Sequence, residues 1–386
     1  MRLSLRLRRP RAIPSARIPA GSFCRVGSTR KNTSYQQLVG VGGLGTGILF
    51  SLEGNHTLGR NESRPGSLLD VRDYCKLHIV SHYVAKLLGS QQFRVIPVGK
   101  VGDDAAGQFV LRELSAAGMD TRFVQTIAHS PTLFSVCFQY PDGTGGNITT
   151  NNSAAEQLSA GDLDLVKEGF SASSTIALTL PEVSLDVRRH FLQLASKAGA
   201  FRAASFVSSE IAAAKAMGFF ERLDLLSLNE SEAGELIGMT FSPDSAQIFA
   251  EACVRFLVAN YPSLQLVVSA GNAGAYAATC DVWNYCPAPK VEVASTAGAG
   301  DCLLGGILAA MARGVPLVSD CPPRKTLTER PLESALEFGV LLASYKVMSP
   351  HTIHPEASWP ALVRFAKEKG IELGASLHGA FDEAGQ

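Results

Sequence analysis

The sequence has no excess of charge of either sign, because Lys plus Arg and Asp plus Glu both number 35 among its 386 residues. The molecule as a whole therefore has no electrostatic bias toward nucleic acid, an anionic membrane or an acidic protein partner. Any anion that it binds must be held by a local site. We expect a small-molecule substrate, and neither a nucleic acid nor a membrane as partner.

Long apolar runs and paired cysteines are also missing. Polar residues interrupt even the richest hydrophobic stretches before they reach the roughly 18 residues of a membrane span. The eight cysteines form no CxxC pair and no Cys/His cluster at ligand spacing, which argues against a disulfide scaffold and structural zinc. These absences favour a reducing, intracellular setting, with the cytoplasm as the first expectation.

Acidic residues are absent from the first 36 residues, which are rich in arginine, and the first acid of the chain is Glu53. An arginine-rich, acid-free composition with serines is typical of an organelle transit peptide, so a mitochondrion or plastid is the alternative location. The segment lacks a clear amphipathic period, however. An unstructured basic leader explains residues 1–36 equally well.

From about residue 90 onward, apolar β-rich runs alternate with helical patterns. The expected strands are 93–99, 175–180, 223–229 and 264–271. The first three precede expected helices that run from Asp103–Asp104 to Gly118, over 187–199 and over 230–237, and the fourth follows a helix through 244–259. This alternation predicts an α/β fold with βαβ units and a mostly parallel sheet covered on both faces.

Two segments, 48–64 and 132–151, break the alternation, and the second contains the turn signal PDGTGG between β-rich flanks. We expect them to form hairpins that serve as a small β lid; plain surface excursions are the alternative. No linker or repeat divides residues 37–375, which we interpret as one domain followed by a tail at 376–386.

One glycine-rich run, VGVGGLGTG at 39–47, places Gly40, Gly42 and Gly45 at the spacing of a dinucleotide fingerprint. That fingerprint needs a crossover helix and an acid after a second strand. Here turn residues come too early, and the nearest acid, Glu62, lies among them. The alternative is a first strand whose glycines permit close backbone approach.

The second run, STAGAGDCLLGG at 295–306, precedes a stretch of small and apolar residues with helical character. Small residues at a helix entrance let backbone N–H groups converge, and the helix dipole adds partial positive charge, so an anion hole is expected. Asp301 could simply cap this helix. A carboxylate beside an anion hole is also what phosphoryl transfer to a hydroxyl requires.

The run 295–303 resembles the C-terminal signature of the ribokinase-like, or PfkB, family of carbohydrate and nucleoside kinases, approximately [DNS]-T-x-G-A-G-D-x-[FL]. The resemblance implies a three-layer αβα sandwich and ATP-dependent phosphorylation of a hydroxyl, most often a hydroxymethyl, of a sugar or sugar-like molecule. It also implies that Asp301 is the catalytic base and that the amides of Gly298, Ala299 and Gly300 form the anion hole.

Two further blocks match this family in order, LLSLNESE and LVVSAGNAG. By resemblance, Asn229 and Glu232 position hydrated Mg²⁺ and the ATP phosphates. The remaining residues expected to border ATP are Ser269, Gly271, Gly274 and Thr296. Asn229 and Glu232 could instead form an ordinary capping box. Some members of the family require K⁺, which makes it a further candidate cofactor.

The N-terminal part departs from the family, because its usual acidic residue and its G-G-x-x-x-N sugar-binding block are both missing. The segment 70–89 stands in their place, and we expect it to be a helix. Asp73 and Lys76 are then at i, i+3 and His78 and His82 at i, i+4, so each pair shares a face. Asp73, Lys76 and His78 are the candidate substrate residues; a partly solvated helix is the alternative.

Three rival functions stay open at this point: a nucleoside kinase of the same fold, a non-catalytic binding or regulatory protein, and a dinucleotide oxidoreductase. The edges of the expected lid hairpins could also pair between subunits, which makes a homodimer a further expectation.

Overall fold

The computed structural model describes residues 34–89, 92–170, 174–319 and 321–382. The basic leader expected at 1–36 lies outside these residues except for its last three positions. The first strand begins at Gln37.

A nine-stranded sheet runs through the described part of the chain in the order β13-β12-β11-β10-β9-β8-β1-β4-β5. All neighbouring pairs are parallel except β11–β12 and β12–β13 at one edge. The strands are β1 (Gln37–Val41), β4 (Arg94–Gly102), β5 (Val124–Ile127), β8 (Thr175–Thr179), β9 (Phe201–Ser205), β10 (Leu225–Asn229), β11 (Gln265–Ser269), β12 (Ala275–Ala278) and β13 (Trp283–Cys286).

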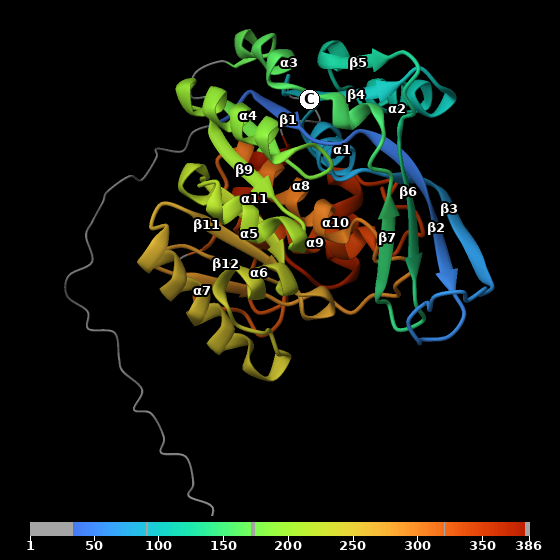
Figure 1. Ribbon diagram of the computed structural model, residues 1–386. Coiled ribbons are helices and arrows are strands. Elements are labelled where there is room, and N and C mark those ends of the chain that lie inside the picture. Colours follow the sequence, from blue (N-terminus) through green and yellow to red (C-terminus); the bar gives the residue numbers. More distant parts are fainter. Residues whose placement is uncertain (1–33, 90–91, 171–173, 320, 383–386) are drawn as a thin grey trace, which may run out of the picture. The chain divides into compact units, whose positions relative to one another are not determined.

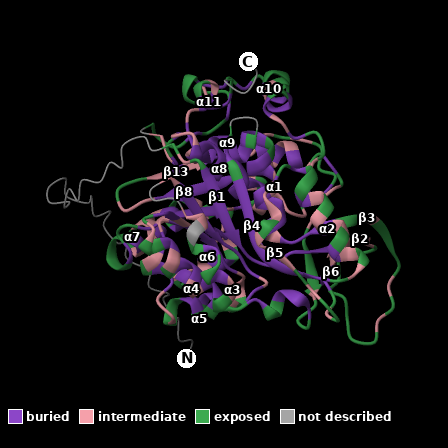
Figure 2. Cartoon of the chain, turned by 90° about the horizontal axis from the view of Figure 1, so that it is seen from above, coloured by how far each residue is buried: buried purple, intermediate pink, exposed green. Residues whose placement is uncertain are grey.

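Helices cover both faces of this sheet, as its doubly buried strands require. Along β1, Leu38 joins the core on one face and its neighbour Val39 the core on the other. The first core also contains α1 (Lys76–Leu88), α2 (Ala105–Ala116), α8 (Ala299–Ala312), α9 (Ala335–Lys346), α10 (Trp359–Glu368) and α11 (Ala375–Phe381). The opposite face carries α3 (Ala160–Asp164), α4 (Leu185–Lys197), α5 (Ile211–Ala216), α6 (Glu230–Ile237) and α7 (Ala246–Asn260). The sheet is accordingly buried between two helical layers (Figure 2), and the expected three-layer sandwich is confirmed.

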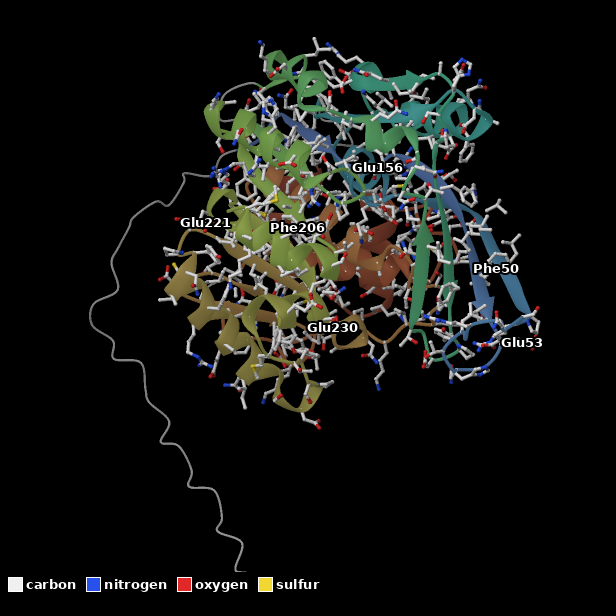
Figure 3. All side chains as sticks on the ribbon, viewed as in Figure 1. Phe50, Glu53, Glu156, Phe206, Glu221 and Glu230 are labelled. Carbon is white, nitrogen blue, oxygen red and sulfur yellow. The ribbon has the colours of Figure 1, made fainter. Side chains whose placement is uncertain are left out.

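A second, four-stranded sheet, which we call the lid sheet, has the order β3-β2-β6-β7. Its strands are β2 (Gly45–Leu52), β3 (Gly66–Tyr74), β6 (Leu133–Gln139) and β7 (Gly145–Thr149). They lie together at one side of the main sheet (Figure 1), and Figure 3 shows Phe50 and Glu53 on the hairpin that projects there. The segment 132–151 contains β6 and β7, which pair antiparallel, whereas the segment 48–64 contains only the end of β2, and its partner β3 lies beyond residue 64.

The prediction of one helix over 70–89 was wrong in its first part. Asp70 and Asp73 lie on β3, which pairs antiparallel with β2 (Thr46↔Tyr74, Gly47↔Asp73), and α1 begins only at Lys76. Pairing with β2, the strand directly before it, decided the conformation here, because the local pattern alone did not distinguish a strand from a helix. Asp73 and Lys76 therefore do not share a helical face.

The glycine-rich run at 39–47 fits the second of its two interpretations, in which the glycines let neighbouring segments pack close to the backbone. A Cβ on Gly40 would lie 2.6 Å from Leu77 Cδ1, and one on Gly45 would lie 2.1 Å from the carbonyl oxygen of Leu133. The chain passes from the main sheet into the lid sheet through these positions. The next element is the strand β2, and a dinucleotide site would need a crossover helix there.

Most of the segment 376–386, which we expected to be a tail outside the domain, belongs to a helix. This helix, α11, spans Ala375–Phe381 and packs on the core. Phe381 is fully buried, and its ring stacks on Phe338 and Trp359 at centroid distances of 4.6 and 5.1 Å. The Trp359 indole donates to Asp382 at 2.7 Å. The last turn of the described chain is thus part of the folded domain.

We predict that Phe381→Ala lowers the free energy of unfolding by about 3–5 kcal/mol, because it removes a buried ring from a packed aromatic cluster. Urea denaturation measures this loss. Glu368→Ala, at an exposed position of the neighbouring helix α10, is the control and should change stability little. A loss below about 1 kcal/mol for Phe381→Ala would show that α11 contributes little to the fold.

Candidate active site

The candidate site residues gather where the parallel strands of the main sheet end, which is where ligands bind in open α/β sheets. Asn229 and Ser269 are the last residues of β10 and β11, and they are paired positions in the ladder. A Cβ on Gly300 would lie 3.8 Å from Ser269 Oγ. Three motifs that are far apart in the sequence therefore meet at one edge of the sheet.

The N-terminus of α8 offers backbone amides where the anion hole is expected, but they are not the same three amides. Gly298 is the N-cap with a φ of 72°, and Asp301 lies in the first turn. The Ala299 N–H donates to the Thr296 carbonyl at 3.1 Å, so it is occupied. Among the described residues, the N–H groups of Gly298, Gly300 and Asp301 have no hydrogen-bond partner, and they are available to an anion.

Gly298 is needed for both its conformation and its size. Its φ of 72° is in the left-handed region, which residues with a side chain rarely adopt. A Cβ there would also lie 2.8 Å from Thr352 Cγ2 and 3.0 Å from the Thr352 carbonyl oxygen. The turn that opens the anion hole is packed against the loop that follows α9.

Lys76 joins Asp301 at this point, because α1 and α8 pack side by side and both begin here. The Lys76 Nζ lies 3.3 Å from Asp301 Oδ1. The Asp301 carboxylate raises the pKa of Lys76, with smaller contributions from Glu182 and Glu232, while burial opposes the shift. Lys76 therefore stays charged at neutral pH beside the candidate base.

The expected nucleotide residues are in part a capping box. Asn229 Oδ1 accepts from the Glu232 N–H, and Glu232 Oε2 accepts from the Asn229 N–H, both at 2.8 Å. Burial raises the pKa of Glu232, whose carboxylate also feels the charges of Lys76 and Asp301. Capping of α6 and proximity to the site are thus compatible, since the box itself lies at the carboxyl end of β10.

The glycines after β11 form a tight turn at the same edge. Gly271 and Gly274 have φ values of 53° and 103°, and a Cβ on Gly274 would lie 2.1 Å from the Cys286 carbonyl oxygen. Thr296, directly before the anion hole, donates to the carbonyl oxygen of Gly143 at 3.4 Å. Because Gly143 is in the turn between β6 and β7, the lid sheet reaches the anion hole in this structure.

Asp73 lies near the site but is occupied by three donors. Its Oδ2 accepts from Ser135 Oγ and Cys137 Sγ of β6, both at 3.0 Å, and its Oδ1 accepts from Thr352 Oγ1 at 2.8 Å. The side chain is buried. Asp73 therefore connects the lid sheet to the loop that supports Gly298.

His78, the third candidate substrate residue, lies in a separate aromatic cluster. Its ring is buried, its centroid lies 4.3 Å from that of Tyr74 with the two rings tilted by 49°, and it lies 6.0 Å from the His82 ring. Burial lowers the pKa of His78 to about 3, so it is neutral at physiological pH. No contact joins it to Asp301 among the described residues, in contrast to Lys76.

Glu182 is a candidate site residue that the sequence analysis missed. It follows β8, has a φ of 73°, and its buried Oε2 has no hydrogen-bond partner among the described residues. A Cβ on Gly43 would lie 2.7 Å from this oxygen. Burial raises the pKa of Glu182 to about 7, and the Lys76 charge opposes the shift. Its position just after a parallel strand is the only signal that could have identified it.

A phosphoryl group could be held by the free amides of α8 while a carboxylate and an ammonium flank it. The description "pfkB family carbohydrate kinase" belongs to the family model that matches residues 80–359, well over half of the chain. The chain belongs to the pfkB family of carbohydrate kinases. The suspected resemblance is therefore confirmed, and the chain is an ATP-dependent kinase of that family.

Named kinases in two kingdoms are similar to this PfkB kinase. A deoxyribokinase of Salmonella typhi is 25% identical over 274 residues, which are 70% of this chain and 80% of that protein. Fructokinase-1 of Oryza sativa subsp. japonica is 26% identical over 284 residues, which are 69% of this chain and 81% of that protein.

Solved structures share the fold of this PfkB kinase. The ribokinase of Cryptococcus neoformans var. grubii serotype A in complex with ADP has a TM-score of 0.69 at 20% identity and covers 86% of this chain and 99% of its own. A putative ribokinase II of E. coli in complex with ATP and Mg²⁺ has a TM-score of 0.64 at 17% identity, covering 86% and 99%. A Burkholderia thailandensis nucleoside kinase in complex with inosine has a TM-score of 0.63 at 16% identity, covering 87% and 99%.

No helix in the described part of this PfkB kinase has both the length and the apolar character that a membrane crossing requires. The described residues also contain no cluster of three or more His, Cys, Asp or Glu side chains that would hold a metal ion unaided.

We predict that Glu182→Gln changes how stability depends on pH. The folded-state pKa of about 7 is above the ordinary 4.5, so the folded protein binds more protons than the unfolded chain between these values. Ionisation of Glu182 therefore lowers the free energy of unfolding as pH rises through this window. Glutamine does not ionise, so the variant should gain on the order of 2 kcal/mol relative to the native protein between about pH 5 and pH 8.

Chemical denaturation at the two pH values measures this difference. Glu156→Gln is the matched control, because the Glu156 side chain is exposed on another part of the surface. A relative stability of Glu182→Gln that is the same at both pH values would show that Glu182 has an ordinary pKa.

Proposed function

We propose that this PfkB kinase transfers the terminal phosphoryl group of ATP to a hydroxyl, by preference a hydroxymethyl, of a sugar or sugar-containing small molecule. The observation that carries this proposal is the α8 N-terminus, where the Asp301 carboxylate lies within one turn of three amides that have no hydrogen-bond partner among the described residues. The amides stabilise charge on the transferred group, and the carboxylate orients the alcohol and accepts its proton.

Lys76 adds a fixed positive charge to this turn. Its ammonium lies 3.3 Å from the Asp301 carboxylate, and it neutralises part of the charge that accumulates during transfer. An ammonium within reach of the reacting groups also opposes the repulsion between Asp301 and the phosphates. We infer that Lys76 acts on the phosphoryl side as much as on the acceptor side.

The nucleotide is proposed to lie along Asn229, Glu232, Ser269, Gly271, Gly274 and Thr296. ATP supplies the phosphoryl group and Mg²⁺ the positive charge that shields its phosphates. The donor set fits such an ion, because Mg²⁺ in phosphoryl transferases is held by one or two carboxylates, by substrate phosphates and by water. Glu232 uses only Oε2 in its capping box, which leaves Oε1 for a hydrated ion. The E. coli neighbour in complex with ATP and Mg²⁺ supports this proposal.

The acceptor is proposed to lie between Glu182 and Asp301, under the lid sheet. Glu182 Oε2 is a buried acceptor without a donor among the described residues, and a sugar hydroxyl would satisfy it. Asp73 already accepts three hydrogen bonds and is proposed to hold the pocket together instead of binding the sugar. His78 is a weaker candidate because it contacts neither carboxylate among the described residues.

A nucleoside acceptor is the alternative, and the neighbour in complex with inosine supports it. The ribose of a nucleoside also carries a hydroxymethyl group, so Asp301 could act as the catalytic base for either class of acceptor. A K⁺ requirement, a homodimer formed through the lid sheet, and the choice between cytoplasm and organelle also remain proposals. Turnover with and without K⁺ and sedimentation of the full chain test the first two.

Asp301→Asn is expected to lower turnover by about 10²–10⁴-fold, because asparagine cannot accept the proton of the alcohol. ATP binding should change little, since the amides of α8 are retained. ADP production and ATP binding by calorimetry measure the two quantities. Asp186→Asn, an exposed carboxylate in the first turn of α4, is the control and should keep full activity.

The acceptor class is tested with pentoses, deoxypentoses, hexoses and nucleosides, each with the native protein and Asp301→Asn. Turnover that depends on the acceptor and is lost in the variant supports the proposal, and competition between sugars and nucleosides separates the two classes. Full activity of Asp301→Asn would refute the assigned base. ATP binding without turnover for any acceptor would favour a non-catalytic binding protein.

A further inference from the structure

Lys346, the last residue of α9, is a fully buried cation that the function described so far does not use. Its ammonium donates to the carbonyl oxygen of Ser295 at 3.1 Å and to that of Ala297. The residue after α9 accepts two hydrogen bonds from the loop before α8: the Val347 carbonyl oxygen binds the N–H groups of Ala294 and Ser295. The end of α9 and the entrance of α8 are thus joined by hydrogen bonds in both directions.

The Ala297 carbonyl belongs to the peptide unit whose N–H is that of Gly298. A cation on the oxygen of a peptide draws electron density from its nitrogen, so it makes the N–H a stronger donor. Gly298 N–H is one of the amides without a partner among the described residues. The contact also fixes the plane of this peptide, which is the geometric requirement for an effective anion hole.

The buried position makes the charge of Lys346 costly and leaves it sensitive to pH. Burial lowers the pKa of Lys346 to about 8. The groups whose charges act on it come from three elements: Cys302 and Asp301 of α8, Asp73 and Asp70 of β3, and His354 of the loop after α9. The carboxylates favour the ammonium form, but they do not overcome burial. Proton loss therefore begins close to physiological pH.

We propose that Lys346 is a positioning residue that orients and polarises the Ala297–Gly298 peptide for phosphoryl transfer. The expected effect of Lys346 on kcat rests on the proposed function. The hydrogen bond between Lys346 and the Ala297 carbonyl does not depend on that function, and it can be tested without any turnover.

Lys346→Met removes the charge and keeps the length of the side chain. We expect kcat to fall by about 10–100-fold with little change in KM for ATP, because the contact acts on the transition state. In the native protein, kcat should decline as pH rises through about 8, where the ammonium loses its proton. Lys346→Met should lack this alkaline decline.

Lys100→Met is the matched control. Lys100 is another buried lysine that donates to a carbonyl oxygen, that of Gln157 at 3.0 Å, and it pairs with Asp162 away from the 295–301 loop. Its substitution should lower stability and leave the alkaline decline of kcat in place. A decline that disappears in both variants would overturn the specific role of Lys346.

The carbonyl ¹³C chemical shift of Ala297, followed by NMR from about pH 6 to pH 10, tests the contact without catalysis. It should titrate near pH 8 in the native protein and stay constant in Lys346→Met. The absence of this titration in the native protein, or a folded Lys346→Met that keeps native kcat, would overturn the inference. If Lys346→Met does not fold, the titration and the pH profile of the native protein decide. If no acceptor is turned over, the proposed function fails while the titration still tests Lys346.

Discussion

The contact between Lys76 and Asp301 is the constraint on which the rest of the site depends. It requires that α1 and α8, which are separated by more than half of the chain, begin at the same point of the sheet edge. Each helix N-terminus brings unpartnered amides and partial positive charge. The carboxylates of Asp301, Glu182 and Glu232 lie close enough to shift the pKa of Lys76. The packing of two helices thus brings one ammonium, three carboxylates and two helix N-termini to the same corner of the sheet.

The sequence was sufficient for those features whose determinants are local. Alternating apolar runs and helical patterns predicted the parallel sheet and its two helical layers, and caps such as Asp104, which accepts from the Gly107 N–H, marked helix starts. The run 295–303 predicted the turn at Gly298 and the place of Asp301. These features depend on residues within a few positions of one another, so one sequence is enough to recognise them.

The features that the sequence did not predict depend on contacts between distant segments. Strand β3 exists because β2 pairs with it, and no local pattern distinguished it from the start of α1. Glu182 comes under the influence of the Lys76 charge only because β8 ends near α1, and Lys346 reaches Ser295 only because α9 ends beside the 295–297 loop. The sequence showed these two residues as ordinary members of a loop and a helix. Long-range packing gave them their burial and their shifted pKa values.

The lid sheet is linked to the same corner by buried polar bonds, which has a consequence for catalysis. Asp73 binds β6 through Ser135 and Cys137 and binds the Gly298 support through Thr352. The β6–β7 turn reaches Thr296. A movement of the lid sheet would therefore act on both sides of the Gly298 turn. Lys346 binds the same turn from the end of α9, and neither of its hydrogen bonds involves the lid sheet, so the Ala297–Gly298 peptide has a support that does not depend on the lid.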